Sequence, residues 1–138
     1  MDNITGKLGG EVLSKRQFQR LEQFLASHDV DLKRGLKSSF QVFEGDKNPV
    51  LRLRRNATRY ETLHELGHFL HYKKIGKAEY LDLARQVGAN IPEKTVFELM
   101  AKPSRWNRLN QLEQNHAWNY LRQYWGMDPT KSFFKWRQ

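Results

Sequence analysis

A single helix is marked at both of its ends in this sequence, and this helix constrains the fold more than any other feature. Thr58 and Glu61 have the spacing of a capping box, in which each side chain accepts a hydrogen bond from the other residue's backbone N–H. Gly76 follows two lysines, and a glycine after basic residues is typical of a helix C-terminus. The pattern predicts one helix over residues 59–75.

Inside this helix lies the pattern H-E-x-x-H, formed by His64, Glu65 and His68. Two histidines at this spacing share a helix face and can bind one Zn²⁺ between them. Zinc lowers the pKa of its bound water towards ~7, and a nearby carboxylate can take the water proton and pass it to a leaving amine. The alternative is a pair of solvated surface histidines. The pattern favours a zinc site with His64 and His68 as ligands and Glu65 as general base.

A catalytic zinc ion normally has three protein ligands, so a third is expected elsewhere in the chain. Glu93 is the first candidate, because it shares a predicted helix face with apolar residues and needs a partner there. Glu113 is the second, with helix capping as its alternative role. His116 is the third, with a hydrogen-bonded core histidine as its alternative. His71 lies about 10 Å along the helix from His64, too far to share the ion, and is expected to be a neighbour.

Three tyrosines are candidate donors to the oxyanion that forms when a peptide bond is hydrolysed. They are Tyr60, Tyr80 and Tyr120. The alternative role of each is packing in the core.

The remaining sequence predicts one α+β domain over residues 1–138, with a flexible start over residues 1–10. Alternating apolar residues between His28 and Arg54 predict a small antiparallel sheet joined by hairpins, directly before the helix that carries the histidines. Its last strand, Val50–Arg54, is expected to lie at an edge with its arginines outward, where an extended peptide could pair with it. Further helices, making about five in all, are predicted over residues 15–27, 77–87, 92–102 and 111–125.

Composition limits the partners and the chemistry of the metal site. The chain has 24 Lys and Arg against 15 Asp and Glu, a net charge of +9, so nucleic acid, acidic lipid or an acidic protein is the expected kind of partner. The chain has 0 Cys, which excludes disulfides and thiolate ligands. No apolar run approaches the ~18 residues of a membrane span, so no stable membrane insertion is expected.

Residues spread over nearly the whole chain resemble one family, the zincin-like metallopeptidase toxin domains at the C-termini of bacterial polymorphic toxins, including contact-dependent inhibition effectors. The residues that carry this resemblance are the opening Gly9–Ser14, the run Ala57–Gly76, Tyr80, Glu93 with Val96 and Phe97, and Glu113 with His116, Ala117 and Tyr120.

The resemblance implies a zincin fold and a toxin that is secreted as part of a larger effector and delivered to the target-cell cytoplasm. It also implies a cognate immunity protein, and the basic charge of this chain suggests that the inhibitor is acidic. By family pattern His64 and His68 bind zinc, Glu65 is the general base and Glu93 is the third ligand, although Glu93 follows Pro92 in a first helical turn and not within a helix. The match at Glu113, His116 and Tyr120 implies supporting roles, and the substrate is a protein or peptide.

Two other functions are compatible with the same sequence. The basic charge, together with Trp125, Phe133 and Trp136, could serve backbone contacts and base stacking in a toxin that acts on nucleic acid. A non-catalytic binding module that keeps a zincin-like shell would instead bind its partner without metal.

Overall fold

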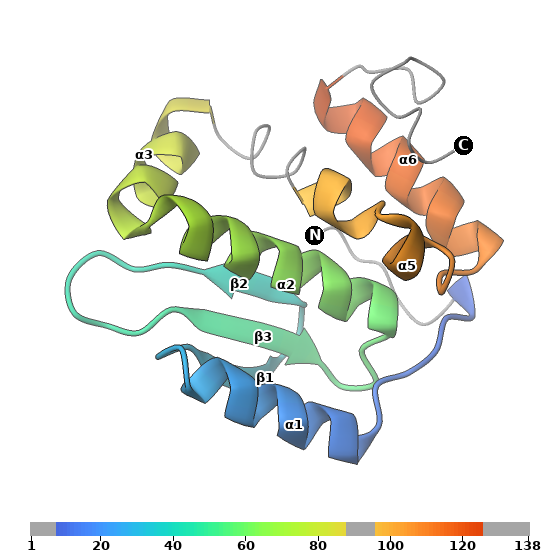
Figure 1. Cartoon of the computed structure of the whole chain (residues 1–138), viewed down its shortest axis with the longest axis horizontal. Helices are drawn as coiled ribbons and strands as arrows, with labels where there is room; N and C mark the ends of the chain where they lie inside the picture. The colour runs from blue at the N-terminus through green and yellow to red at the C-terminus, as the bar shows by residue number, and fades with distance from the viewer. Residues whose placement is uncertain (1–7, 88–95, 126–138) are drawn as a thin grey trace.

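A computed structural model describes residues 8–87 and 96–125 and confirms an α+β fold (Figure 1). Residues 96–100 are also helical and carry no label in Figure 1. In chain order the labelled elements are α1 (Lys15–Ala26), β1 (Asp31–Gly35), β2 (Ser39–Gln41), β3 (Val50–Arg54), α2 (Arg59–Ile75), α3 (Lys77–Val87), α5 (Pro103–Trp106) and α6 (Gln111–Trp125).

Capping boxes mark the starts of α1 and α2. The side chains of Thr58 and Glu61 form the predicted capping box of α2, and Gly76 ends that helix with a φ of 87°. Ser14 caps α1 through a second box with Gln17. The short helix α5 was not predicted, although Pro103 at its first position is a common helix start.

The sheet differs from the predicted antiparallel one. Its strand order is β1-β3-β2, with β1 parallel to β3 and β2 antiparallel to β3. The strand Val50–Arg54 is therefore central, and its prediction as an edge strand was wrong. Alternation of apolar residues indicates which face of a strand is buried, but it does not indicate which strand lies beside it.

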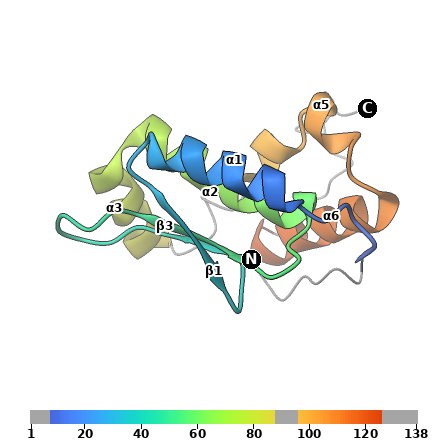
Figure 2. The ribbon, with the colours of Figure 1, turned by 90° about the horizontal axis from the view of Figure 1, so that it is seen from below.

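Helices α1 and α2 cover one face of the sheet (Figure 2), and α2 contributes to both hydrophobic cores of the described chain. One core joins α1, the sheet and α2 through residues that include Leu25, Leu51, Leu53 and Phe69. The other joins α2 to α5, α6 and residues 96–100 through residues that include Tyr60, Val96, Phe97, Trp106 and Ala117. No described helix has both the length and the apolar character that crossing a bilayer requires.

Gly67 allows the second core to reach the backbone of α2. A Cβ at this position would lie 2.9 Å from Cγ1 of Val96 and 3.3 Å from its Cβ. Val96 is fully buried, and its branched side chain has little freedom to move away. The absence of a side chain at Gly67 is therefore what lets residues 96–100 pack against the helix that carries the two histidines.

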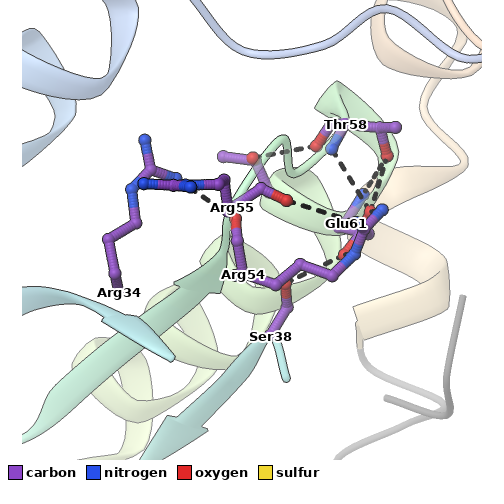
Figure 3. A network of polar contacts seen from close by, with 7 residues as sticks. Arg34, Ser38, Arg54, Arg55, Thr58 and Glu61 are labelled. Carbon is purple, nitrogen blue, oxygen red and sulfur yellow. Dashed lines mark hydrogen bonds and ion pairs between the residues drawn. The ribbon is translucent and has the colours of Figure 1, made fainter. Parts of the chain in front are cut away.

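An ion pair between half-buried Arg54 and buried Glu61 joins the end of β3 to the first turn of α2 (Figure 3). Nε of Arg54 donates to Oε2 of Glu61 at 2.7 Å, and Nη2 donates to Oε1 at 2.5 Å. The Ser38 hydroxyl also donates to Oε2, at 3.0 Å. Arg54 was expected to point outward from the strand; it turns instead to Glu61, whose side chain is only 2% exposed.

We expect Gly67→Ala to lower the free energy of unfolding. Overpacking a core costs roughly 1–3 kcal/mol, and the 2.9 Å approach to a stiff neighbour places this cost above the gain of about 1 kcal/mol that alanine has over glycine in a helix. Chemical denaturation of Gly67→Ala, Val96→Ala and the double variant measures the effect. The loss in the double variant should be smaller than the sum of the single losses, and strictly additive losses would contradict the contact.

We expect Arg54→Met to lower the free energy of unfolding by about 3–5 kcal/mol, because it leaves the buried Glu61 carboxylate without its cation. Arg59→Met is the matched control. Arg59 pairs with Glu11 at 3.3 Å, and the Glu11 side chain is 59% exposed. Breaking such a surface pair costs at most about 1 kcal/mol. Equal losses in the two variants, measured by denaturation, would show that burial of the Glu61 pair has no energetic consequence.

Candidate metal centre

The three residues of the H-E-x-x-H pattern come together on one side of α2. His64, Glu65 and His68 are 3%, 1% and 8% exposed. Each offers one ligand atom, and these atoms all lie within 4.8 Å of one another. The two imidazole rings are 5.0 Å apart between centroids, with an angle of 70° between their planes. The group has the donors and the compactness to hold a metal ion.

A buried carboxylate oxygen of Glu65 supports a cation at this position. Its Oε2 atom is buried and has no hydrogen-bond partner among the residues that the structure describes. An ionised carboxylate removed from water requires a compensating charge or hydrogen bond. Imidazole nitrogen and carboxylate oxygen are ligands of divalent metals such as zinc, so the donor set fits such an ion.

Aromatic residues from two other helices lie against the two histidines. The Tyr120 ring, from α6, is 5.6 Å from the His64 ring and perpendicular to it. The Tyr80 hydroxyl, from α3, lies 3.4 Å from Nδ1 of His68, within hydrogen-bond distance. Both tyrosines are buried. The site is thus enclosed by side chains of α2, α3 and α6.

His116 lies beside this group without belonging to it. Its Nδ1 is 2.8 Å from the Tyr60 hydroxyl, and its ring stacks on Tyr120 at 5.9 Å between centroids. His116 is hydrogen-bonded, as its alternative role predicted, but it is half-buried and not fully enclosed in the core. The partnership with Tyr60 was not foreseen, because the two residues are far apart in the sequence.

Glu113 caps α6, the alternative role predicted for it. The backbone N–H of Asn110 donates to its Oε1 at 3.0 Å, and the backbone N–H of Glu113 donates to Oδ1 of Asn110 at 2.8 Å. Its Oε2 is buried against Gly10, where an added Cβ would come within 2.0 Å. Burial raises the pKa of Glu113; the hydrogen bond from Asn110 opposes this shift, and the negative charges of Glu11 and Glu61 add to it.

The N-terminal segment, predicted to be flexible over residues 1–10, packs near Glu113 through Gly10. Of the start expected to be flexible, residues 8–10 are described, and the carbonyl of Leu8 accepts a hydrogen bond from the Asn110 side chain at 2.8 Å. Residues 1–7 lie outside the described residues. The N-terminal segment also pairs with the start of α2, through an isolated bridge between Val12 and Thr58.

His71 is a buried neighbour of the donor group, as predicted from its distance along the helix. Its ring lies 5.7 Å from that of Tyr80. Burial lowers the pKa of His71, and the nearby His68 and Lys74 lower it further. His71 is therefore held in its neutral form at physiological pH.

The first candidate for the third ligand, Glu93, lies in residues 88–95, outside the described residues. Its assignment as a ligand stays a prediction. The sequence did not indicate the contact between Tyr80 and His68, since Tyr80 was predicted as an oxyanion donor or, alternatively, as a core residue.

We expect Glu113→Gln to raise the free energy of unfolding at pH 7.5. The amide keeps an acceptor for the Asn110 N–H and removes a buried charge. The pKa of Glu113 is raised in the folded state, so the protonated side chain stabilises the fold relative to the ionised one. This stabilisation is lost as pH rises through the folded-state pKa. The gain should shrink in denaturation experiments near pH 4. Glu22→Gln, at an exposed position of α1, is the control; a gain that is equal at both pH values would contradict the raised pKa.

Comparisons of the chain with protein-family models, with curated proteins and with solved structures found no match.

Proposed function

We propose that this protein is a zinc-dependent metallopeptidase of the zincin type that acts as a toxin in competing bacteria. The observation that carries the proposal is the convergence of His64, Glu65 and His68, whose ligand atoms lie within 4.8 Å of one another in a buried site. Histidines and a glutamate in this pattern on a helix are the residue types that metal-assisted hydrolysis of a peptide bond requires.

In this proposal His64 and His68 hold the metal, each through one ring nitrogen, and Glu93 is the third ligand that the family resemblance implies. Zinc, when bound, supplies Lewis-acid chemistry at the site. Glu65 accepts a proton from the attacking water and returns it to the leaving amine. Its carboxylate suits this role, because Oε2 has no hydrogen bond to another described residue that would compete for the proton.

The sheet offers an extended peptide a different strand from the one first expected. Since β3 is central, the free edge on the α2 side belongs to β2, which pairs with β3 alone among the described strands. Phe40 of β2 packs against Tyr80, which in turn contacts His68. A peptide that added a strand to β2 would therefore lie near the metal residues, and its backbone would supply the hydrogen bonds.

The charge of the chain supports the partner implied by the resemblance. A net charge of +9 favours fast association with an acidic protein through electrostatic steering. The cognate immunity protein in this proposal is acidic and binds the toxin in the cell that produces it. The lack of cysteine is compatible with passage of an unfolded domain during delivery, because no disulfide has to be reduced.

We expect Glu65→Gln to abolish toxicity and peptide cleavage while zinc binding, at about one ion per chain, is retained. The experiment expresses wild type and variant in susceptible cells and searches the proteome for new N-termini. Glu79→Gln, at an exposed position of α3, is the matched control and should behave as wild type.

The other outcomes of this experiment separate the alternative functions. A folded Glu65→Gln protein that remains fully toxic would overturn the mechanism. Nucleic-acid cleavage that survives in Glu65→Gln would favour the toxin that acts on nucleic acid. A wild-type protein that folds and binds its partner but contains no zinc would favour the non-catalytic module.

A further inference from the structure

We infer that Tyr80 is a positioning residue for the metal ligand His68: its hydroxyl holds Nδ1 of the imidazole, so that Nε2 is presented to the metal. The inference rests on the proposed function, since it requires that His68 bind a metal. It adds a residue from a second helix, α3, to a site whose identified ligands come from α2 alone.

The contact joins two buried side chains. The Tyr80 hydroxyl lies 3.4 Å from Nδ1 of His68, and each residue is 8% exposed. Gly76 is the single residue between α2 and α3, and its φ of 87° reverses the chain between the two helices. This tight connection places Tyr80 of α3 opposite His68 of α2. A hydrogen bond shielded from water restricts ring rotation more than one that solvent can replace.

The ring of Tyr80 is itself held in place by other aromatic residues. Phe40 of β2 lies 6.1 Å from it, Tyr72 lies 5.9 Å from it and His71 lies 5.7 Å from it, all measured between ring centroids. These contacts come from the sheet and from α2 and are edge-to-face, the arrangement that aromatic pairs prefer. The position of the hydroxyl is thus set by packing before any metal binds.

The chemistry of the pair explains how this arrangement serves a metal ligand. An imidazole that binds a metal through one nitrogen carries a hydrogen on the other, and that N–H needs an acceptor. The Tyr80 oxygen supplies the acceptor, so the tautomer with hydrogen on Nδ1 is stabilised, and in this tautomer Nε2 carries the lone pair that binds a metal. A phenylalanine at this position would keep the packing and lose only the acceptor.

Zinc affinity of the full chain tests the inference. Competition with a chromophoric chelator should give Tyr80→Phe an affinity lower by about 10–100-fold, the usual effect of removing the hydrogen-bond partner of a ligating histidine. Tyr72→Phe is the matched control: it removes one hydroxyl from the same aromatic cluster and should leave the affinity unchanged. Thermal unfolding in the presence of chelator should differ only by the small loss that one hydrogen bond causes. A fall in zinc affinity of the expected size then reports on metal binding and not on folding.

A second measurement reports on the hydrogen bond directly. In zinc-loaded wild type the Nδ1 proton of His68 should exchange slowly with water and give an NMR signal, which Tyr80→Phe should lose. Equal zinc affinities of wild type and Tyr80→Phe would overturn the inference and leave the proposed function intact. A wild-type chain that binds no zinc would overturn both.

Discussion

The buried carboxylate of Glu61 sets the position of α2, and the rest of the structure is arranged around that helix. A carboxylate that is only 2% exposed is tolerated because Arg54 meets both of its oxygens and because Ser38 and Thr58 also donate to it. The pair joins the last residue of β3 to the first turn of α2. Once this turn is held, the helical repeat of about 3.6 residues per turn determines the direction of every later side chain. Phe69 then faces the sheet and Gly67 faces Val96. His64 faces α6, and His68 faces α3.

Because α2 is covered on several sides, its buried residues do not form one apolar stripe. Glu61, His64, Glu65 and His71 are all buried although each is polar. An ordinary surface helix would place such residues towards water, so hydropathy alone would have assigned this side of α2 to the solvent. The H-E-x-x-H spacing predicted only that the two histidines share one helix face, with solvated surface histidines as the alternative. His64 and His68 are 3% and 8% exposed, which does not agree with that alternative.

Interactions between residues that are close in the sequence could be predicted, and interactions between distant parts of the chain could not. The ends of α2 and the start of α6 were predictable, because the capping contacts of Thr58 with Glu61 and of Asn110 with Glu113 span only three residues. The parallel pairing of β1 with β3 was not, since the same alternation of apolar residues is compatible with either direction. Contacts between separate helices, such as Tyr60 with His116, leave no local signal at all. The grouping of His64, Glu65 and His68 was predictable because the three residues lie on one helix, whereas the residues that pack against them were found only in the structure.

The cores and ion pair around α2 stabilise the chain enough to keep the polar candidate metal site buried. Two imidazoles and a carboxylate packed within 4.8 Å of one another, away from water, are costly to bury without a cation. The hydrophobic cores on either side of α2, the capping box at its start and the Arg54 pair all lie outside this group, and their contributions do not depend on metal. They can therefore offset the cost of the site in the metal-free chain. A metal that binds the folded chain alone then adds stability in proportion to the logarithm of its concentration over its Kd. The cores, the capping box and the Arg54 pair hold His64, Glu65 and His68 together without metal. Metal binding therefore needs little rearrangement of these residues, and little binding free energy is lost in ordering them.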